Sequence, residues 1–112
     1  MGTAAGGGAA KEAQDVVENE LPALIRQVEE GRFAEAVALG NRLLGAQDLT
    51  STQAVTIQKE LGVAYVALDR TDLAEASFRA ALSLQPNLEL DTVRTSPRVL
   101  EAFSRAKQPA AP

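Results

Sequence analysis

Apolar residues along the chain recur at intervals of three and four positions, the spacing that places them on one face of an α-helix. Five runs show this spacing, at residues 21–28, 33–44, 54–68, 73–82 and 99–106. No window alternates apolar and polar residues over enough positions to indicate a β-strand. The pattern therefore predicts an all-α fold.

The limits of the first helix are set by three residues. Asn19 is a suitable N-cap, and Pro22, three positions later, is tolerated in a first helical turn. Gly31 stops the run. Upstream, residues 13–17 could form a short preceding helix or an extension of this one, and the pattern leaves both alternatives open.

The later helices carry clearer start signals. Thr50 followed by Gln53 matches the capping box, in which the two residues exchange side-chain and backbone hydrogen bonds. Thr71 can cap the fourth helix. Ser96-Pro97 pairs an N-cap with a proline at the favoured first position of the fifth helix.

The joints within two pairs of helices are short. About two residues connect the first helix to the second and the third to the fourth, so each pair must run antiparallel as a hairpin. One hairpin cannot bury its apolar face alone, so we expect the two to stack. Residues 1–10, which hold four of the eight glycines, are expected to form a flexible linker, and residues 108–112 a disordered tail. The expected domain spans residues 11–107.

Composition narrows the function. The 112 residues support one small domain, and no run approaches the roughly 20 apolar residues that cross a bilayer. The sequence has no Cys and no His, which removes the usual ligands of transition metals and the commonest catalytic base. The net charge of −4 argues against a nucleic-acid partner. We therefore expect a protein that is not an enzyme, without catalytic, metal-binding or cofactor-binding residues.

The strongest local signal lies between residues 61 and 86. Small, aromatic and turn residues occur there at fixed intervals, at Leu61, Gly62, Tyr65, Ala74, Phe78, Ala81 and Pro86. Gly62 and Ala74 are small enough for two helices to cross closely, and the two aromatic rings can fill the space beside the crossing. Ala81 leaves room for a further helix. The proline ends the second helix because it has no N–H.

These intervals resemble the tetratricopeptide repeat (TPR), a two-helix repeat, and all seven positions agree with its signature. Gln58 stands where the family often has Trp. Asp69 stands where the inter-helix Gly is usual, although Asp tolerates turn conformations.

A weaker copy of the same repeat lies upstream. Gly31, Phe33, Ala36 and Leu44 resemble its turn and second helix, and Gly40 stands where an aromatic is expected. The interval from Gly31 to Asp69 is longer than the family's period of about 34 residues, and the difference fits a four-residue insertion in the loop around residues 45–51.

The resemblance implies antiparallel hairpins stacked as a short right-handed superhelix. The repeats would span about residues 21–50 and 52–87. A helix at residues 97–107 would act as a cap or as the first helix of a third repeat. Two repeats are fewer than the roughly three usually needed for stability, so flanking helices or self-association should contribute.

In this family the first helix of each hairpin lines a concave groove that binds a peptide or helix of another protein. The groove residues implied here are Thr56, Lys59, Val63, Val66 and Ala67 from the second repeat, with Leu21, Ile25 and Val28 from the first. The competing interpretation is that the N-terminal segment or a neighbouring molecule covers these residues.

Charge is uneven along the chain. Residues 94–107 hold four bases and one acid, whereas residues 11–36 hold seven acids and three bases. The basic segment is either an attachment point for an acidic partner or a second molecule, or a solvated helix face with cations at its C-terminal end.

The expected function is therefore a non-catalytic protein–protein interaction module that binds a peptide or helix in its groove. The alternative is a self-associating scaffold or assembly factor of a bacterial envelope, secretion or motility complex, which would make the chain a homo-oligomer. We expect no membrane insertion. The default location is cytoplasmic, or periplasmic or envelope-associated if the chain is a fragment that lacks its signal.

Overall fold

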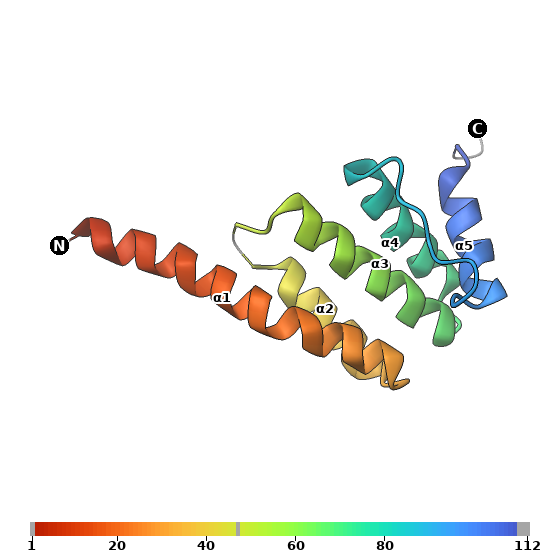
Figure 1. The fold of residues 1–112 in the computed structure, drawn as a ribbon, viewed down its shortest axis with the longest axis horizontal. Helices are drawn as coiled ribbons and strands as arrows, with labels where there is room; N and C mark the ends of the chain where they lie inside the picture. Colours follow the sequence, from red (N-terminus) through yellow and green to blue (C-terminus); the bar gives the residue numbers. More distant parts are fainter. Residues whose placement is uncertain (1, 47, 110–112) are drawn as a thin grey trace.

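The part of the chain that the computed structural model describes forms five α-helices (Figure 1). The structure describes residues 2–46 and 48–109, with side chains from residue 14 onward. The helices are α1 (Gly2–Glu29), α2 (Phe33–Leu44), α3 (Ser51–Ala67), α4 (Thr71–Leu84) and α5 (Pro97–Lys107). The described residues contain no strand, so the all-α prediction is confirmed. Among them, no helix is both long and apolar enough to cross a membrane.

Helix α1 is longer than the sequence predicted. It begins at Gly2 and runs through Asn19 and Pro22, so the cap expected at Asn19 is wrong. Of the two alternatives for residues 13–17, the extension is the one observed. Proline inside a helix costs roughly 3 kcal/mol. The continued helix keeps Val17 and Leu24 fully buried on one face, which offsets this cost.

The N-terminal end of α1 also differs from the expected linker over residues 1–10. Residues 2–10 are helical, while Met1 lies outside the described residues. Four alanines favour a helix in this segment and four glycines oppose it, so local propensity alone does not explain the helix there. Figure 1 shows the first half of α1 projecting beyond the other helices. At the other terminus, residues 110–112 of the expected tail are likewise outside the described residues.

The turns that follow α1 and α3 share one unusual backbone conformation. Gly31 has a φ of +78° and Asp69 a φ of +59°. Glycine adopts this left-handed region freely, and aspartate is one of the few other residues that tolerates it. The sequence prediction that Asp69 can take the place of the usual glycine in this turn is therefore confirmed.

Hydrogen bonding at the first turn follows the Schellman pattern of helix ends. The N–H of Arg32 donates to the carbonyl of Gln27 at 2.8 Å, and the N–H of Gly31 donates to the carbonyl of Val28 at 3.1 Å. Two of the carbonyls that a helix end leaves unpaired, those of Gln27 and Val28, are thereby satisfied.

The turn after α3 repeats this pattern of hydrogen bonds. The N–H of Arg70 donates to the carbonyl of Tyr65 at 2.8 Å, and the N–H of Asp69 donates to that of Val66 at 3.0 Å. The two hairpins, α1–α2 and α3–α4, therefore reverse direction by the same local mechanism.

Helix α3 lies at the centre of the molecule and contacts each of the other four helices. Its two sides enter two buried clusters. The N-terminal core comprises Val17, Leu24, Ala36, Leu39, Leu43, Ile57, Leu61 and Ala64. The C-terminal core comprises Val55, Val66, Ala74, Phe78, Ala81, Leu88, Val99, Ala102, Phe103 and Ala106. Tyr65 packs against both clusters, and its hydroxyl accepts a hydrogen bond from the Asn41 amide at 3.2 Å.

Glycines allow close packing on both sides of α3. A Cβ built at Gly62 would lie 2.4 to 2.7 Å from three ring carbons of Phe78, so the ring occupies the space that a side chain would fill. A Cβ at Gly40 of α2 would lie 2.7 and 2.9 Å from two carbons of Leu61. Gly40, which replaces the aromatic expected in the upstream repeat, is thus opposite a large residue of the next helix.

The end of the chain packs back onto α3 and α4. Helix α4 ends at Leu84, with Gln85 as its C-cap directly before Pro86, as predicted. The following segment buries Leu88 and leads to α5, where the Ser96 hydroxyl accepts from the N–H of Val99 at 3.3 Å, so this predicted cap is confirmed. The cap predicted at Thr71 is wrong, because α4 begins at that residue without a side-chain cap.

Replacing Gly62 by alanine is expected to destabilise the fold by about 1–3 kcal/mol, because the added methyl group overlaps the buried ring of Phe78. Gly45→Ala is the matched control: its backbone is right-handed helical and its Cβ would make only ordinary contact, at 3.4 Å. We expect that control to be neutral or slightly stabilising. Urea denaturation followed by circular dichroism measures both. Equal stability of the two variants would contradict the assigned packing.

Candidate functional site

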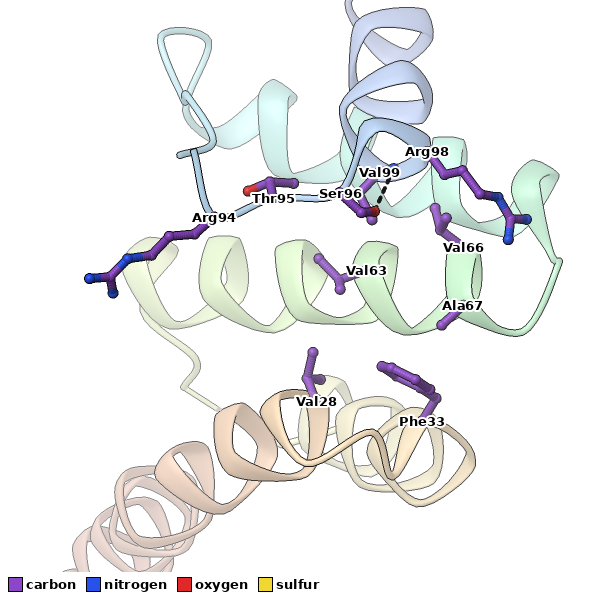
Figure 2. Close-up of a pocket in the computed structure, with 10 residues that line it drawn as sticks. All are labelled: Val28, Phe33, Val63, Val66, Ala67, Arg94, Thr95, Ser96, Arg98 and Val99. Carbon is purple, nitrogen blue, oxygen red and sulfur yellow. Dashed lines mark hydrogen bonds between the residues drawn. The ribbon is translucent and has the colours of Figure 1, made fainter. Parts of the chain in front are cut away.

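An open cleft of about 410 Å³ lies where α1, α3 and the start of α5 come together (Figure 2). We call it the α1–α3–α5 cleft. Its lining consists of Val28, Phe33, Val63, Val66, Ala67, Arg94, Thr95, Ser96, Arg98 and Val99. Six of these ten side chains are apolar, so the cleft is an apolar hollow with polar groups gathered on one wall.

One wall comes from the first hairpin. Val28 stands in the last turn of α1, and Phe33 is the first residue of α2, directly after the turn at Gly31. The left-handed turn reverses the chain within a few residues, so both side chains face α3 from the same side (Figure 2). Val63 points toward Val28 across the opening.

The opposite wall is the segment that leads into α5, and Asp91 organises it. Its carboxylate accepts hydrogen bonds from the N–H groups of Val93 at 2.9 Å and Arg94 at 3.3 Å. Its carbonyl accepts from the N–H of Thr95 at 3.0 Å. These bonds fold residues 91–95 into a turn that carries Thr95 and Ser96 to the edge of the cleft.

Two arginines stand on this wall, and both have partners within the chain. Arg98 forms an ion pair with Asp69, the residue that makes the left-handed turn after α3. Arg94 lies 3.9 Å from the carboxylate of Asp91 and keeps a highly exposed side chain. Asp69 therefore ties the start of α5 to the end of α3, in addition to forming the turn.

The structure brings together four of the eight groove residues named from the sequence. Val28, Val63, Val66 and Ala67 line the cleft. The other four, Thr56, Lys59, Leu21 and Ile25, are partly exposed but are not among the lining residues. Thr56 and Lys59 lie one to two turns toward the N-terminal end of α3, whereas the cleft is at its C-terminal end.

Sequence reasoning missed the wall formed by α5. Val99, Ser96 and the two arginines reach the cleft because residues 85–96 lead back to α3, a path set by tertiary contacts such as the burial of Leu88. The Ser96-Pro97 pair predicted where α5 begins, but no local pattern predicted which helix the start of α5 would pack against. Phe33 was named from the sequence in the turn and second helix of the upstream repeat, but not as a groove residue.

The cleft region offers little for acid–base or metal chemistry. Among the described residues, no cluster of three or more His, Cys, Asp or Glu side chains could hold a metal ion. Glu60 lies one turn before Val63 and is half-buried. Burial raises the pKa of its carboxyl above 4.5; nearby Lys59 lowers this pKa and Glu29 on α1 raises it.

Glu60→Gln is expected to increase the free energy of unfolding, and this increase should be larger at pH 7 than at pH 4.5. Because the folded-state pKa of Glu60 exceeds its unfolded value, the fold favours the protonated carboxyl, and that contribution is lost as the pH rises through the raised pKa. The glutamine amide does not ionise, so the variant does not lose this contribution to stability as the pH rises. Thermal melts of both chains between pH 4 and pH 7.5 measure the difference, and a constant difference across that range would contradict the assignment. Glu29→Gln should reduce the same pH dependence in part.

No protein-family model, curated protein or solved structure matches this chain. The assignment of a function therefore rests on the residues and geometry described above.

Proposed function

We propose that this chain is a non-catalytic protein–protein interaction module of the TPR type, which holds a peptide or helix of a partner protein in the α1–α3–α5 cleft. The observation that carries this proposal is the apolar lining of an open cleft assembled from both hairpins and α5. Contiguous apolar surface with a polar rim is typical of interaction sites.

The size and lining of the cleft support a particular kind of occupant. A volume of about 410 Å³ is at the lower end of ligand pockets and accommodates one or two large apolar side chains. Val28, Val63 and Ala67 would contact those anchors. Thr95 and Ser96 supply polar groups on one wall only, so they would orient the bound segment.

The repeated turn supports the TPR part of the proposal. The same pair of hydrogen bonds closes both hairpins, once around Gly31 and once around Asp69. Stacking in the manner of TPR proteins would place the first helices of the hairpins, α1 and α3, along one concave face. The cleft lies between these two helices, with α5 closing its third side.

The exposed face of α5 argues that the stack stops there. Arg98, Glu101, Ser104 and Arg105 are exposed on this helix, and all four are polar. Terminal helices of repeat proteins carry such polar outer faces. We therefore assign α5 the role of a cap, which leaves the cleft as the accessible apolar surface on this side.

Placing a charge in the cleft is expected to weaken partner binding at least tenfold, because a glutamate would lose its hydration against apolar side chains. Ala67→Glu is the primary variant, since Ala67 is exposed and the change should not unfold the chain. Val63→Glu is the deeper companion. Ala38→Glu, on an exposed face of α2 outside the cleft, is the matched control.

The unsubstituted chain and the control are first used to retain proteins from native lysate. A retained partner is then purified and its affinity for each chain is measured by titration. The proposal predicts a protein retained by both of these and lost with Ala67→Glu and Val63→Glu. The same retained proteins in the same amounts for all four chains would remove the cleft as the binding site.

A further inference from the structure

The charged residues that line the α1–α3–α5 cleft are all of one sign. Its ten lining residues, all within the described part of the chain, include two arginines, Arg94 and Arg98, and no aspartate or glutamate. The chain as a whole has 15 acidic and 11 basic residues, so the balance at this site is the reverse of the overall composition. A basic surface therefore lies directly beside the apolar side chains of the cleft.

The two arginines stand at opposite ends of the wall formed by the start of α5. Figure 2 shows Thr95, Ser96 and Val99 between them, with the side chains of Arg94 and Arg98 extending in opposite directions. An apolar side chain seated in the cleft would therefore have a guanidinium on either side of it along this wall.

Arg94 is able to bind a carboxylate from another molecule. Its side chain is 89% exposed, and its ion pair with Asp91 spans 3.9 Å, which is too long for a hydrogen bond. The carboxylate of Asp91 instead accepts hydrogen bonds from the backbone N–H groups of Val93 and Arg94. The planar guanidinium, with its five N–H donors, is thus available for a second carboxylate.

Arg98 is paired with Asp69, but this pair is open to water. The two side chains are 60% and 80% exposed. Ion pairs on an exposed surface contribute little to stability, so exchange of Asp69 for a carboxylate of a bound segment costs little. The guanidinium can also donate to two carboxylates at once, because its donors point in several directions.

Two carboxylates near the cleft belong to α1 and α3 rather than to the α5 wall. Glu29 follows Val28 on α1, and Glu60 lies one turn before Val63 on α3. Neither is a lining residue. Acidic groups of a bound segment would therefore lie along the α5 wall, away from these two glutamates.

A short acidic segment fits this arrangement better than an extended anionic surface does. A nucleic acid or an anionic membrane would also meet the rest of the chain, whose net charge is −4. A peptide segment would meet only the cleft and the two arginines beside it.

We propose that the segment bound in the α1–α3–α5 cleft carries an apolar anchor with aspartate or glutamate on both sides of it, and that these carboxylates pair with Arg94 and Arg98. This preference for acidic flanks presupposes the proposed function, because it concerns the partner of the same cleft. Burial of the anchor supplies the affinity common to all apolar segments, and the two ion pairs distinguish acidic segments from the others.

Three synthetic peptides test the preference. Each has a central Leu-Phe pair, since the cleft accommodates one or two large apolar side chains, and is flanked on both sides by two aspartates, two asparagines or two lysines. Fluorescence anisotropy of a labelled peptide measures its affinity. The aspartate peptide should bind at least tenfold more tightly than the asparagine peptide, and the lysine peptide should bind most weakly. Raising NaCl from about 50 mM to about 500 mM should reduce these differences, because salt screens exposed charges.

Charge reversal identifies the residues that bind the acidic flanks. Arg94→Glu combined with Arg98→Glu should reverse the order, so that the lysine peptide binds more tightly than the aspartate peptide. This variant should fold, because both side chains are exposed and a glutamate in the first turn of α5 favours the helix. Arg42→Glu combined with Arg79→Glu makes the same change in net charge outside the cleft and should keep the original order.

Three results would overturn the proposal. Equal affinities for the three peptides, all lost in Ala67→Glu, would show a cleft that does not select acidic flanks, and the proposed function would stand. An unchanged order in the variant with Arg94→Glu and Arg98→Glu would exclude these arginines as the selecting groups. No binding of the aspartate peptide up to about 1 mM would exclude acid-flanked anchors, whereas the proposed function is decided by the proteins retained from lysate.

Discussion

Phe78 packs onto α3 because Gly62 has no side chain, and much of the second half of the molecule depends on this contact. Any Cβ at position 62 would overlap the ring. From this position, the ring meets Phe103 of α5 edge to face, with centroids 5.4 Å apart and planes at 88°. The first turn of α5 forms one wall of the α1–α3–α5 cleft. Gly62 on α3 therefore influences the shape of the α1–α3–α5 cleft. It admits Phe78 of α4, and Phe78 in turn packs against α5, which forms one wall of that cleft.

The left-handed turns supply the second constraint. Gly31 reverses the chain so that Val28 and Phe33 face α3 together, and Asp69 reverses it at the equivalent point of the second hairpin. The two residues are not interchangeable in what they add. Asp69 costs more backbone strain than glycine would, but its carboxylate also forms an exposed ion pair with Arg98 at the start of α5. A glycine there would relax the turn and remove the ion pair.

Local signals in the sequence predicted α2 to α5, the capping box at Thr50 and the cap at Ser96, because each depends on residues within one or two turns. The same signals failed at Pro22 and Thr71. At Pro22, burial of Val17 against distant residues outweighs the local cost of proline, which no window of sequence records. For the same reason, only one part of the cleft was predicted from the sequence. The valines on α1 and α3 follow from helical spacing, whereas the wall from residues 94–99 depends on where the long connection after α4 returns.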